Sequence, residues 1–263
     1  MQNESPDLLE FLKDILSALM FLSRIPIPWD KISETPPDFN RSFWAFPLAG
    51  FILGIISGLL FLILFYIGLP IIISVTIGVF FSIILTGALH EDGLADTIQG
   101  FSEGKDREHI LELMRGSNIG TYGALSLIIL VFLKIGTLTS LGMQNHWYVF
   151  SGFIVSGAIG RSMIVFLRSI SEPISNSDVN ELSKKMEGSI LWSSLGLAFL
   201  ITVIFSPFWV AIIGITLCII QTYGVMAYAD KKIGGVTGDI LGANEQISEI
   251  NFLIIFSAIY GYL

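Results

Sequence analysis

The chain has 263 residues, of which 53% are hydrophobic and only 14% charged, and its mean hydropathy is +0.75. Soluble domains carry about 25% charged residues, so this composition excludes an ordinary water-soluble domain and indicates an integral membrane protein. The formal net charge of −8 argues against a nucleic-acid partner, because nucleic-acid binding needs a basic surface. The single cysteine, Cys218, lies in an apolar run and allows no disulfide within one chain.

The first helix expected, at residues 8–22, is predicted to lie on the membrane surface rather than to cross the membrane. Its apolar run carries Glu10, Lys13 and Asp14 on one side, a pattern typical of an interfacial amphipathic helix. The acidic segment before it lacks the positively charged start of a secretory signal peptide.

Apolar runs that can cross a membrane follow, since a spanning helix needs about 20 apolar residues. They form three pairs, each separated by a short break without Lys or Arg: 42–69 and 71–89, 122–141 and 147–167, and 190–204 and 209–228. A last run at 250–263 is short, and it is expected to tilt, to stay re-entrant or to cross a thinned bilayer. We therefore expect an all-α membrane bundle of about six or seven spans, in one domain over residues 1–263.

The basic residues predict how this bundle is oriented. Eleven of the 14 Lys and Arg residues lie in the N-terminal part and in the long connections 91–121, 169–189 and 229–249, or at their edges. The positive-inside rule places these segments in the cytoplasm. We expect the first and last of these connections to form an active site that faces the cytoplasm.

The strongest candidate site is the segment 90–96, which follows 48 residues without a charged side chain. A helix would place Asp92 and Asp96 on one face, and Mg²⁺ favours carboxylates combined with substrate phosphate oxygens. Glu91 would point about 100° away from Asp92 and is a weaker metal ligand. His90 is a candidate proton carrier, and Gly93 leaves room for an anionic group beside the backbone. The alternative is a solvated helix start whose acidic residues favour the positive end of the helix dipole.

Two further segments contain candidate binding residues. Arg115 and Ser117 belong to a run of small and glycine residues that can bind phosphate through the guanidinium group and backbone N–H groups. The glycine-rich segment 234–245 contains Thr237 and Gly238, which allow close backbone approach to a ligand, and Asp239, a third candidate metal ligand. A flexible loop and a simple turn are the respective alternatives.

Two cations lie inside the predicted spans. Arg161 follows two small residues and is predicted to pair with a carboxylate or to bind phosphate from within the bundle. Lys134 has no acidic residue near it in the sequence, and the sequence assigns it no role. Glu245 and Glu249 follow the glycine-rich segment at helical spacing.

Together, these residues suit the transfer of a phosphoryl-linked group at the membrane face. Mg²⁺ would neutralise a diphosphate and stabilise a leaving nucleotide, while a carboxylate accepts the proton of an attacking hydroxyl. A cation-coupled transporter could use the same carboxylates. Transporters tend to carry such residues near the bilayer midplane, however, and here they lie at the edges of spans.

Four stretches of the chain give it a more specific resemblance. They are FLSRIPIP at 21–28, FPLAG at 46–50, LHEDGLAD at 89–96 and GVTGDILGA at 235–243. In this order they resemble the cobalamin synthases (adenosylcobinamide-GDP ribazoletransferases). A CDP-alcohol phosphatidyltransferase is a less similar alternative, because that family has an alanine–arginine pair after its first Asp-Gly.

The resemblance implies an enzyme of cobalamin biosynthesis in the bacterial inner membrane, surrounded by lipid. It implies Mg²⁺-dependent joining of adenosylcobinamide-GDP to α-ribazole or its 5'-phosphate. The ribazole 3'-hydroxyl would attack the cobinamide-linked phosphorus, and GMP would leave. Two departures from the family pattern affect the expected metal site: Gln99 stands where an Asp is usual, and 116–118 reads Gly-Ser-Asn instead of Asp-Ser-Arg. The sequence leaves open whether the protein is a homo-oligomer.

Overall fold

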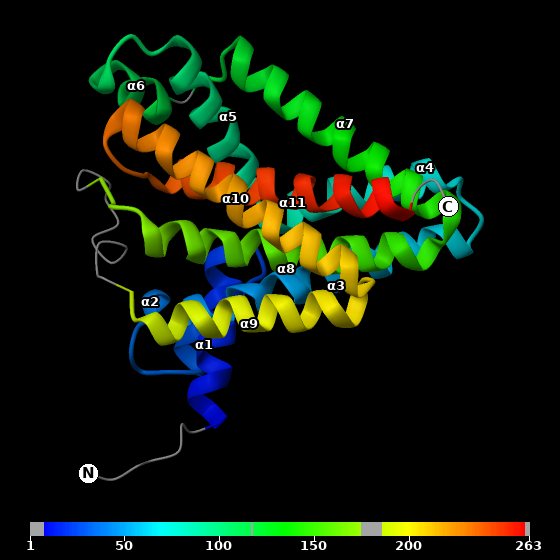
Figure 1. Ribbon diagram of the computed structural model, residues 1–263. Helices are drawn as coiled ribbons and strands as arrows, with labels where there is room; N and C mark the ends of the chain where they lie inside the picture. Colours follow the sequence, from blue (N-terminus) through cyan, green and yellow to red (C-terminus); the bar gives the residue numbers. More distant parts are fainter. Residues whose placement is uncertain (1–7, 117, 175–185, 261–263) are drawn as a thin grey trace.

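The computed structural model describes residues 8–116, 118–174 and 186–260, which form a bundle of helices (Figure 1). In these ranges there is no β-strand, and the extended pairing is an isolated bridge between Pro173 and Val236. The α-helices, in chain order, are α1 (Leu8–Leu22), α2 (Phe39–Ser42), α3 (Phe46–Tyr66), α4 (Ile71–Thr86), α5 (Leu89–Glu103), α6 (Arg107–Arg115), α7 (Thr121–Gln144), α8 (His146–Ile170), α9 (Gly188–Phe205), α10 (Phe208–Ile233) and α11 (Gly238–Tyr260).

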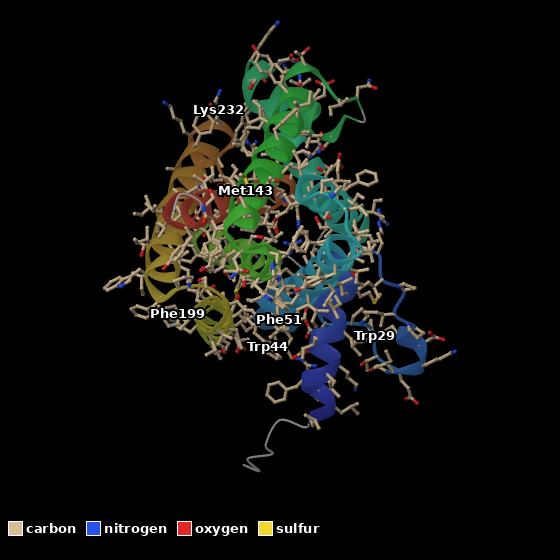
Figure 2. All side chains as sticks on the ribbon, turned by 90° about the vertical axis from the view of Figure 1, so that its right-hand side faces the viewer. Trp29, Trp44, Phe51, Met143, Phe199 and Lys232 are labelled. Carbon is tan, nitrogen blue, oxygen red and sulfur yellow. The ribbon has the colours of Figure 1, made fainter. Side chains whose placement is uncertain are left out.

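The expected membrane bundle is confirmed. Within the described ranges, five helical segments are long and apolar enough to span a membrane: Phe39–Tyr66, which ends in α3, and α7, α8, α9 and α10. The bent pair α4 and α5 would make a sixth. Helix α8 is almost entirely buried, whereas α7 and α9 carry exposed apolar residues such as Met143 (77% exposed) and Phe199 (41% exposed), as expected for lipid-facing surfaces (Figure 2).

The closest contact in the bundle is between α3 and α8, and glycines make it possible. Gly50, Gly54 and Gly58 are spaced four apart and so lie on one face of α3, where they contact the backbone and side chains of α8. A Cβ atom at Gly54 would lie 2.5 Å from the carbonyl oxygen of Phe153 and 2.6 Å from the Cα of Ile154. Small residues at this spacing let two membrane helices approach until their backbones touch.

The last helix is longer than the sequence indicates. The predicted connection 229–249 is mostly helical, because α10 continues to Ile233 and α11 begins at Gly238. The expectation of a separate short run at 250–263 is therefore wrong: the described part of this run is the second half of a 23-residue helix. Glu245 and Glu249 come directly before the apolar run 250–263 in the sequence. Within the fold they belong to the same helix and pair with cations from other helices.

The predicted connection 91–121 is also mostly helical, since it contains most of α5 and all of α6. Helix α5 turns by 87° from α4. At this turn Gly87 (φ 68°) and Ala88 (φ 58°) both adopt the left-handed conformation, which only glycine accepts without strain. The Arg24 amide donates to the Leu85 carbonyl at 2.8 Å, so the segment after α1 holds this turn in place.

Helix α1 runs steeply across the direction of α9 (Figure 1). Its large apolar residues Leu8, Leu9, Phe11 and Leu12 are exposed, and at 15 residues α1 is not among the helices that can span. Its Asp14 is buried within the protein. These features fit the predicted interfacial helix.

Replacement of Gly54 by alanine should destabilise the bundle. The added Cβ would overlap backbone atoms of α8, and forced overpacking of this kind typically costs ~1–3 kcal/mol. We expect Gly54→Ala to lower the thermal unfolding midpoint in detergent. The matched control is Gly224→Ala on α10, where no atom lies within 4 Å of the added Cβ. This control should leave the midpoint unchanged or raise it, and equal midpoints for the two variants would contradict the close α3–α8 contact.

Candidate active site

Three aspartates lie near one another where α5 meets the start of α11. Asp92 and Asp96 lie one turn apart on α5, and Asp239 lies in the first turn of α11. Burial raises the pKa of Asp96 to about 6, and the negative charges of Asp92 and Asp239 contribute to the shift. Burial and the charge of Asp92 likewise raise the pKa of Asp239. The three carboxylates are therefore close enough to repel one another, and a bound cation would relieve this repulsion.

Two glycines bring α5 and α11 together at this point. A Cβ atom at Gly93 would lie 2.7 Å from the carbonyl oxygen of Asp239, and one at Gly242 would lie 3.2 Å from the Cα of His90. The structure thus corrects the interpretation of Gly93: the backbone of Asp239 fills the space beside it, so this space is not open to a substrate. The role of Gly93 is to let the two helices touch.

The segment before α11 is held by the residues that directly follow α8. The Val236 amide donates to the Glu172 carbonyl at 3.0 Å, and the Ile174 amide donates to the Val236 carbonyl at 3.1 Å. Thr237 caps the start of α11. Its hydroxyl and carbonyl oxygens accept from the amides of Ile240 and Leu241 at 3.4 and 3.2 Å. Gly238 is exposed, and no atom lies within 4 Å of the position of a Cβ. Of the predicted binding residues, Gly238 therefore offers an open approach to the backbone.

The chemistry of the aspartates suits a magnesium ion that is completed by its substrate. Among the residues described, no three His, Cys, Asp or Glu side chains converge into a ready-made metal site. Mg²⁺ does not need one, since it usually binds one or two carboxylates together with waters and substrate phosphates. The mutual repulsion of Asp92, Asp96 and Asp239, all oxygen donors, fits such a partial site.

A cluster of buried charges lies in the interior of the bundle, and we call it the ion cluster. It consists of Glu91 on α5, Lys134 on α7, Arg161 on α8, and Glu245 and Glu249 on α11. Lys134 donates to Glu249 at 2.6 Å and lies 3.8 Å from Glu91. Arg161 pairs with Glu245 at 2.5 Å and also with Glu249. All five side chains are at least nine-tenths buried, so the pairs connect four helices in the absence of bulk water.

The ion cluster contains two of the predicted site residues, Arg161 and Glu91, and a third, His90, lies against it. Arg161 pairs with carboxylates, which is one of its two expected roles. Glu91 is directed toward Lys134 in the interior, whereas Asp92 next to it is exposed. His90 is also buried, with Nδ1 3.3 Å from an oxygen of Glu245. These three residues are therefore buried, whereas Asp92 is exposed.

Sequence reasoning missed the other half of this cluster. It gave Lys134 no role, because the partner Glu249 is 115 positions away in the chain. The available signal was the number of charges: two cations within apolar runs call for buried carboxylates, and Glu245 and Glu249 are one helical turn apart in an apolar segment.

Arg115 and Gln99 lie toward the ends of α6 and α5. Arg115 is exposed at the end of α6, and Ser117 lies outside the described residues. Gln99, which stands where an Asp was expected, is buried, and its side-chain oxygen accepts from the Gly123 amide at 3.0 Å. In this chain Gln99 therefore supports the start of α7.

A comparison with protein families agrees with these motifs. Residues 14–257 match the family model for cobalamin-5-phosphate synthase. The chain belongs to this family. The cobalamin-5-phosphate synthase match includes all three aspartates and every member of the ion cluster.

Relatives of known name agree with this assignment. The chain is 35% identical over 259 residues to an adenosylcobinamide-GDP ribazoletransferase of Thermoanaerobacter sp. (strain X514), covering 95% of this chain and 99% of the relative. It is 33% identical over 250 residues to an enzyme of the same name in Azorhizobium caulinodans, covering 92% and 94%. A third enzyme of this name, from Shewanella amazonensis, is 31% identical over 91% of this chain and 92% of the relative. No solved structure matches the chain.

The ion cluster generates a stability prediction. Lys134→Met removes the cation beside Glu249 and Glu91, and an unpaired buried charge typically costs ~3–5 kcal/mol. We expect a large drop in the thermal midpoint in detergent. Adding Glu249→Gln should restore part of the loss, because it removes one of the three carboxylates that are left with Arg161 as their one cation in the ion cluster. Strictly additive effects in this double-mutant cycle would contradict the pairing.

Proposed function

We propose that this protein is an adenosylcobinamide-GDP ribazoletransferase, which carries out the final assembly step of cobalamin biosynthesis. In this reaction the hydroxyl of α-ribazole, or of its 5'-phosphate, forms a bond to the phosphorus that carries cobinamide. The bond between this phosphorus and GMP breaks, and GMP leaves. The products are adenosylcobalamin, or its 5'-phosphate, and GMP.

The observation that carries this proposal is the meeting of two distant motifs. The stretches at 89–96 and 235–243 touch through Gly93 and Gly242, which brings Asp92 and Asp96 to Asp239. The family relationship supports the identity of the substrates, and this geometry supports a diphosphate site beside the three aspartates.

Asp92, Asp96 and Asp239 are the residues that would hold Mg²⁺. When bound, the ion would neutralise charge on the diphosphate and on the departing GMP. Glu91 is not assigned to this group, because it is directed toward Lys134 in the interior.

The residues of the chain supply the remaining chemistry. The proton of the attacking ribazole hydroxyl passes to a carboxylate of the aspartate group, of which Asp92 is the most exposed. The open backbone at Gly238 lies at the N-terminal end of α11, where N–H groups and the helix dipole favour an anion such as phosphate. His90 is assigned to supporting the first turn of α5, because it is buried against Glu245.

We further propose that the protein lies in the bacterial inner membrane with the aspartates facing the cytoplasm. The support is the distribution of Lys and Arg in the long connections. Nucleotide-linked substrates would then reach the aspartates from the cytoplasm. The exposed apolar faces of α7 and α9 would contact lipid.

Purified protein in detergent should form cobalamin or its 5'-phosphate from adenosylcobinamide-GDP and α-ribazole or its phosphate, with GMP released. EDTA should abolish product formation and added Mg²⁺ should restore it. Asp92→Asn should lower the rate by several orders of magnitude, because it removes a charged oxygen ligand. The matched control Asp30→Asn, at an exposed position in the short helix Trp29–Lys31, should keep full activity. The measurement is chromatography of the corrinoid product and of GMP.

Three results would oppose this assignment. Full turnover by Asp92→Asn would exclude the aspartate mechanism, and full turnover in EDTA would exclude a metal-dependent one. Activity on CDP-diacylglycerol with none on adenosylcobinamide-GDP would exclude the cobinamide substrate and favour a CDP-alcohol phosphatidyltransferase.

A further inference from the structure

A second surface, on the other side of the bundle, has the layout of a binding site for an amphipathic molecule. It consists of a polar cavity and an apolar groove. The first, which we call the polar cavity after its charged residues Asp38, Arg41 and Glu187, has about 360 Å³ and lies between α2 and the start of α9. Its other lining residues include Met186. The apolar groove, of about 520 Å³, continues along α9. Trp44 and Ile190 line both, so the cavity and the groove adjoin.

We propose that this surface binds one phospholipid with a zwitterionic headgroup of the phosphatidylethanolamine type, with its phosphate at Arg41 and an acyl chain in the groove. This proposal does not depend on the proposed catalytic activity.

The groove has the length and lining expected for one acyl chain. It follows α9 from Ser189 to Leu200, which is about 16 Å of helix at ~1.5 Å per residue. This is close to half of the ~30 Å hydrocarbon core of a bilayer, the depth of one leaflet. Leu197 and Leu200 line its deeper part, and Gly196 leaves open space above the helix backbone.

Two tryptophans lie at the end of the groove that adjoins the polar cavity. Trp44 lies between α1 and α9 (Figure 2), and its ring contacts Phe11 of α1 edge to face at a centroid distance of 5.4 Å. Trp192, one turn into α9, is 72% exposed. Tryptophan is enriched where headgroups meet acyl chains, so these two residues place the polar cavity at headgroup level.

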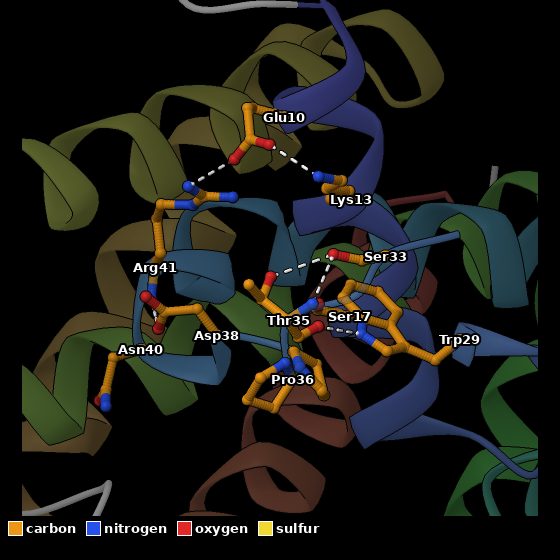
Figure 3. A pocket seen from close by; sticks show the side chains of 11 residues that line it. Glu10, Lys13, Ser17, Trp29, Ser33, Thr35, Pro36, Asp38, Asn40 and Arg41 are labelled. Atoms are coloured by element: carbon orange, nitrogen blue, oxygen red, sulfur yellow. Dashed lines mark hydrogen bonds and ion pairs between the residues drawn. The ribbon is translucent and has the colours of Figure 1, made fainter. Parts of the chain in front are cut away.

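The headgroup end contains a preoriented arginine. Arg41 donates through Nε to the buried Asp14 at 2.7 Å and pairs through Nη1 with Glu10 at 2.8 Å. Figure 3 shows Arg41 and Lys13 meeting Glu10 from two sides. Asp14 also accepts from the Trp44 indole at 2.9 Å, which links the arginine to the start of the groove. A guanidinium group has five N–H donors, so these bonds hold it in place and leave donors for a phosphate.

The charges of the polar cavity select the kind of headgroup. Its lining carries one cation, Arg41, which already pairs with Glu10 and Asp14, and two further carboxylates, Asp38 and Glu187. A phosphate alone would meet more negative than positive charge. A headgroup with both a phosphate and an ammonium group can place the first at Arg41 and the second between the carboxylates. This complementarity favours a zwitterionic phospholipid over an anionic one.

The test is native mass spectrometry of the intact, delipidated protein in detergent containing phosphatidylethanolamine, phosphatidylglycerol or diacylglycerol at equal concentration. We expect one phosphatidylethanolamine to be retained about tenfold more strongly than either other lipid, equivalent to ~1.4 kcal/mol. Equal retention of the three lipids, or preferred retention of phosphatidylglycerol, would overturn the proposal.

Two variants locate the lipid. Gly196→Leu fills the groove without touching another residue at its Cβ and should reduce retention at least tenfold. The matched control Gly136→Leu makes the same change on α7, also with open space, and should retain lipid like the unchanged protein. Trp192→Ala, at an exposed position, is the second variant should Gly196→Leu fold poorly.

Unchanged retention in a folded groove variant would overturn the proposal. So would a protein dimer that dissociates in Gly196→Leu, because the groove would then belong to a second copy of the chain.

Discussion

Charges that cannot reach water hold the functional end of this bundle together. Lys134 and Arg161 lie inside helices that are otherwise apolar, and each needs a carboxylate within a few ångströms. Glu249 serves both cations, and Glu91 and Glu245 each lie beside one. Because these residues come from α5, α7, α8 and α11, the requirement for pairing fixes how the four helices sit relative to one another. An apolar contact of the same size would allow them to slide.

This pairing also orients the aspartates, through the first turns of α5 and α11. Glu91 belongs to the ion cluster, and Asp92 is its neighbour in the chain. Since successive residues of a helix point about 100° apart, anchoring Glu91 in the interior turns Asp92 outward. On α11, Glu245 and Glu249 anchor the helix in the same cluster, and Asp239 lies about one and a half turns before Glu245. One buried network thus orients both helices that carry the aspartates, while the aspartates themselves stay accessible.

Glycines complete this arrangement in two places. On α3 they let the backbone touch α8, which carries Arg161. Between α5 and α11, Gly93 and Gly242 remove the side chains that would hold the two motifs apart. In a membrane, where apolar association between helices is weak, close backbone contact and paired charges are the main sources of specific packing. The three aspartates and the close contact therefore depend on the same pair of segments.

The sequence by itself determined the class of the protein, because long charge-free runs have few other stable solutions than membrane helices. It also identified the aspartates and the family, since both depend on local motifs whose order along the chain is visible. It could not place the end of α10 or the start of α11, because the charges of Glu245 and Glu249 resemble a polar connection until their partners are known. Nor could it assign Lys134 or identify Lys134 as the partner of Glu91. Those outcomes depend on which charges meet between segments far apart in the chain, such as Lys134 and Glu249, 115 positions apart, and only the packing of the helices decides that.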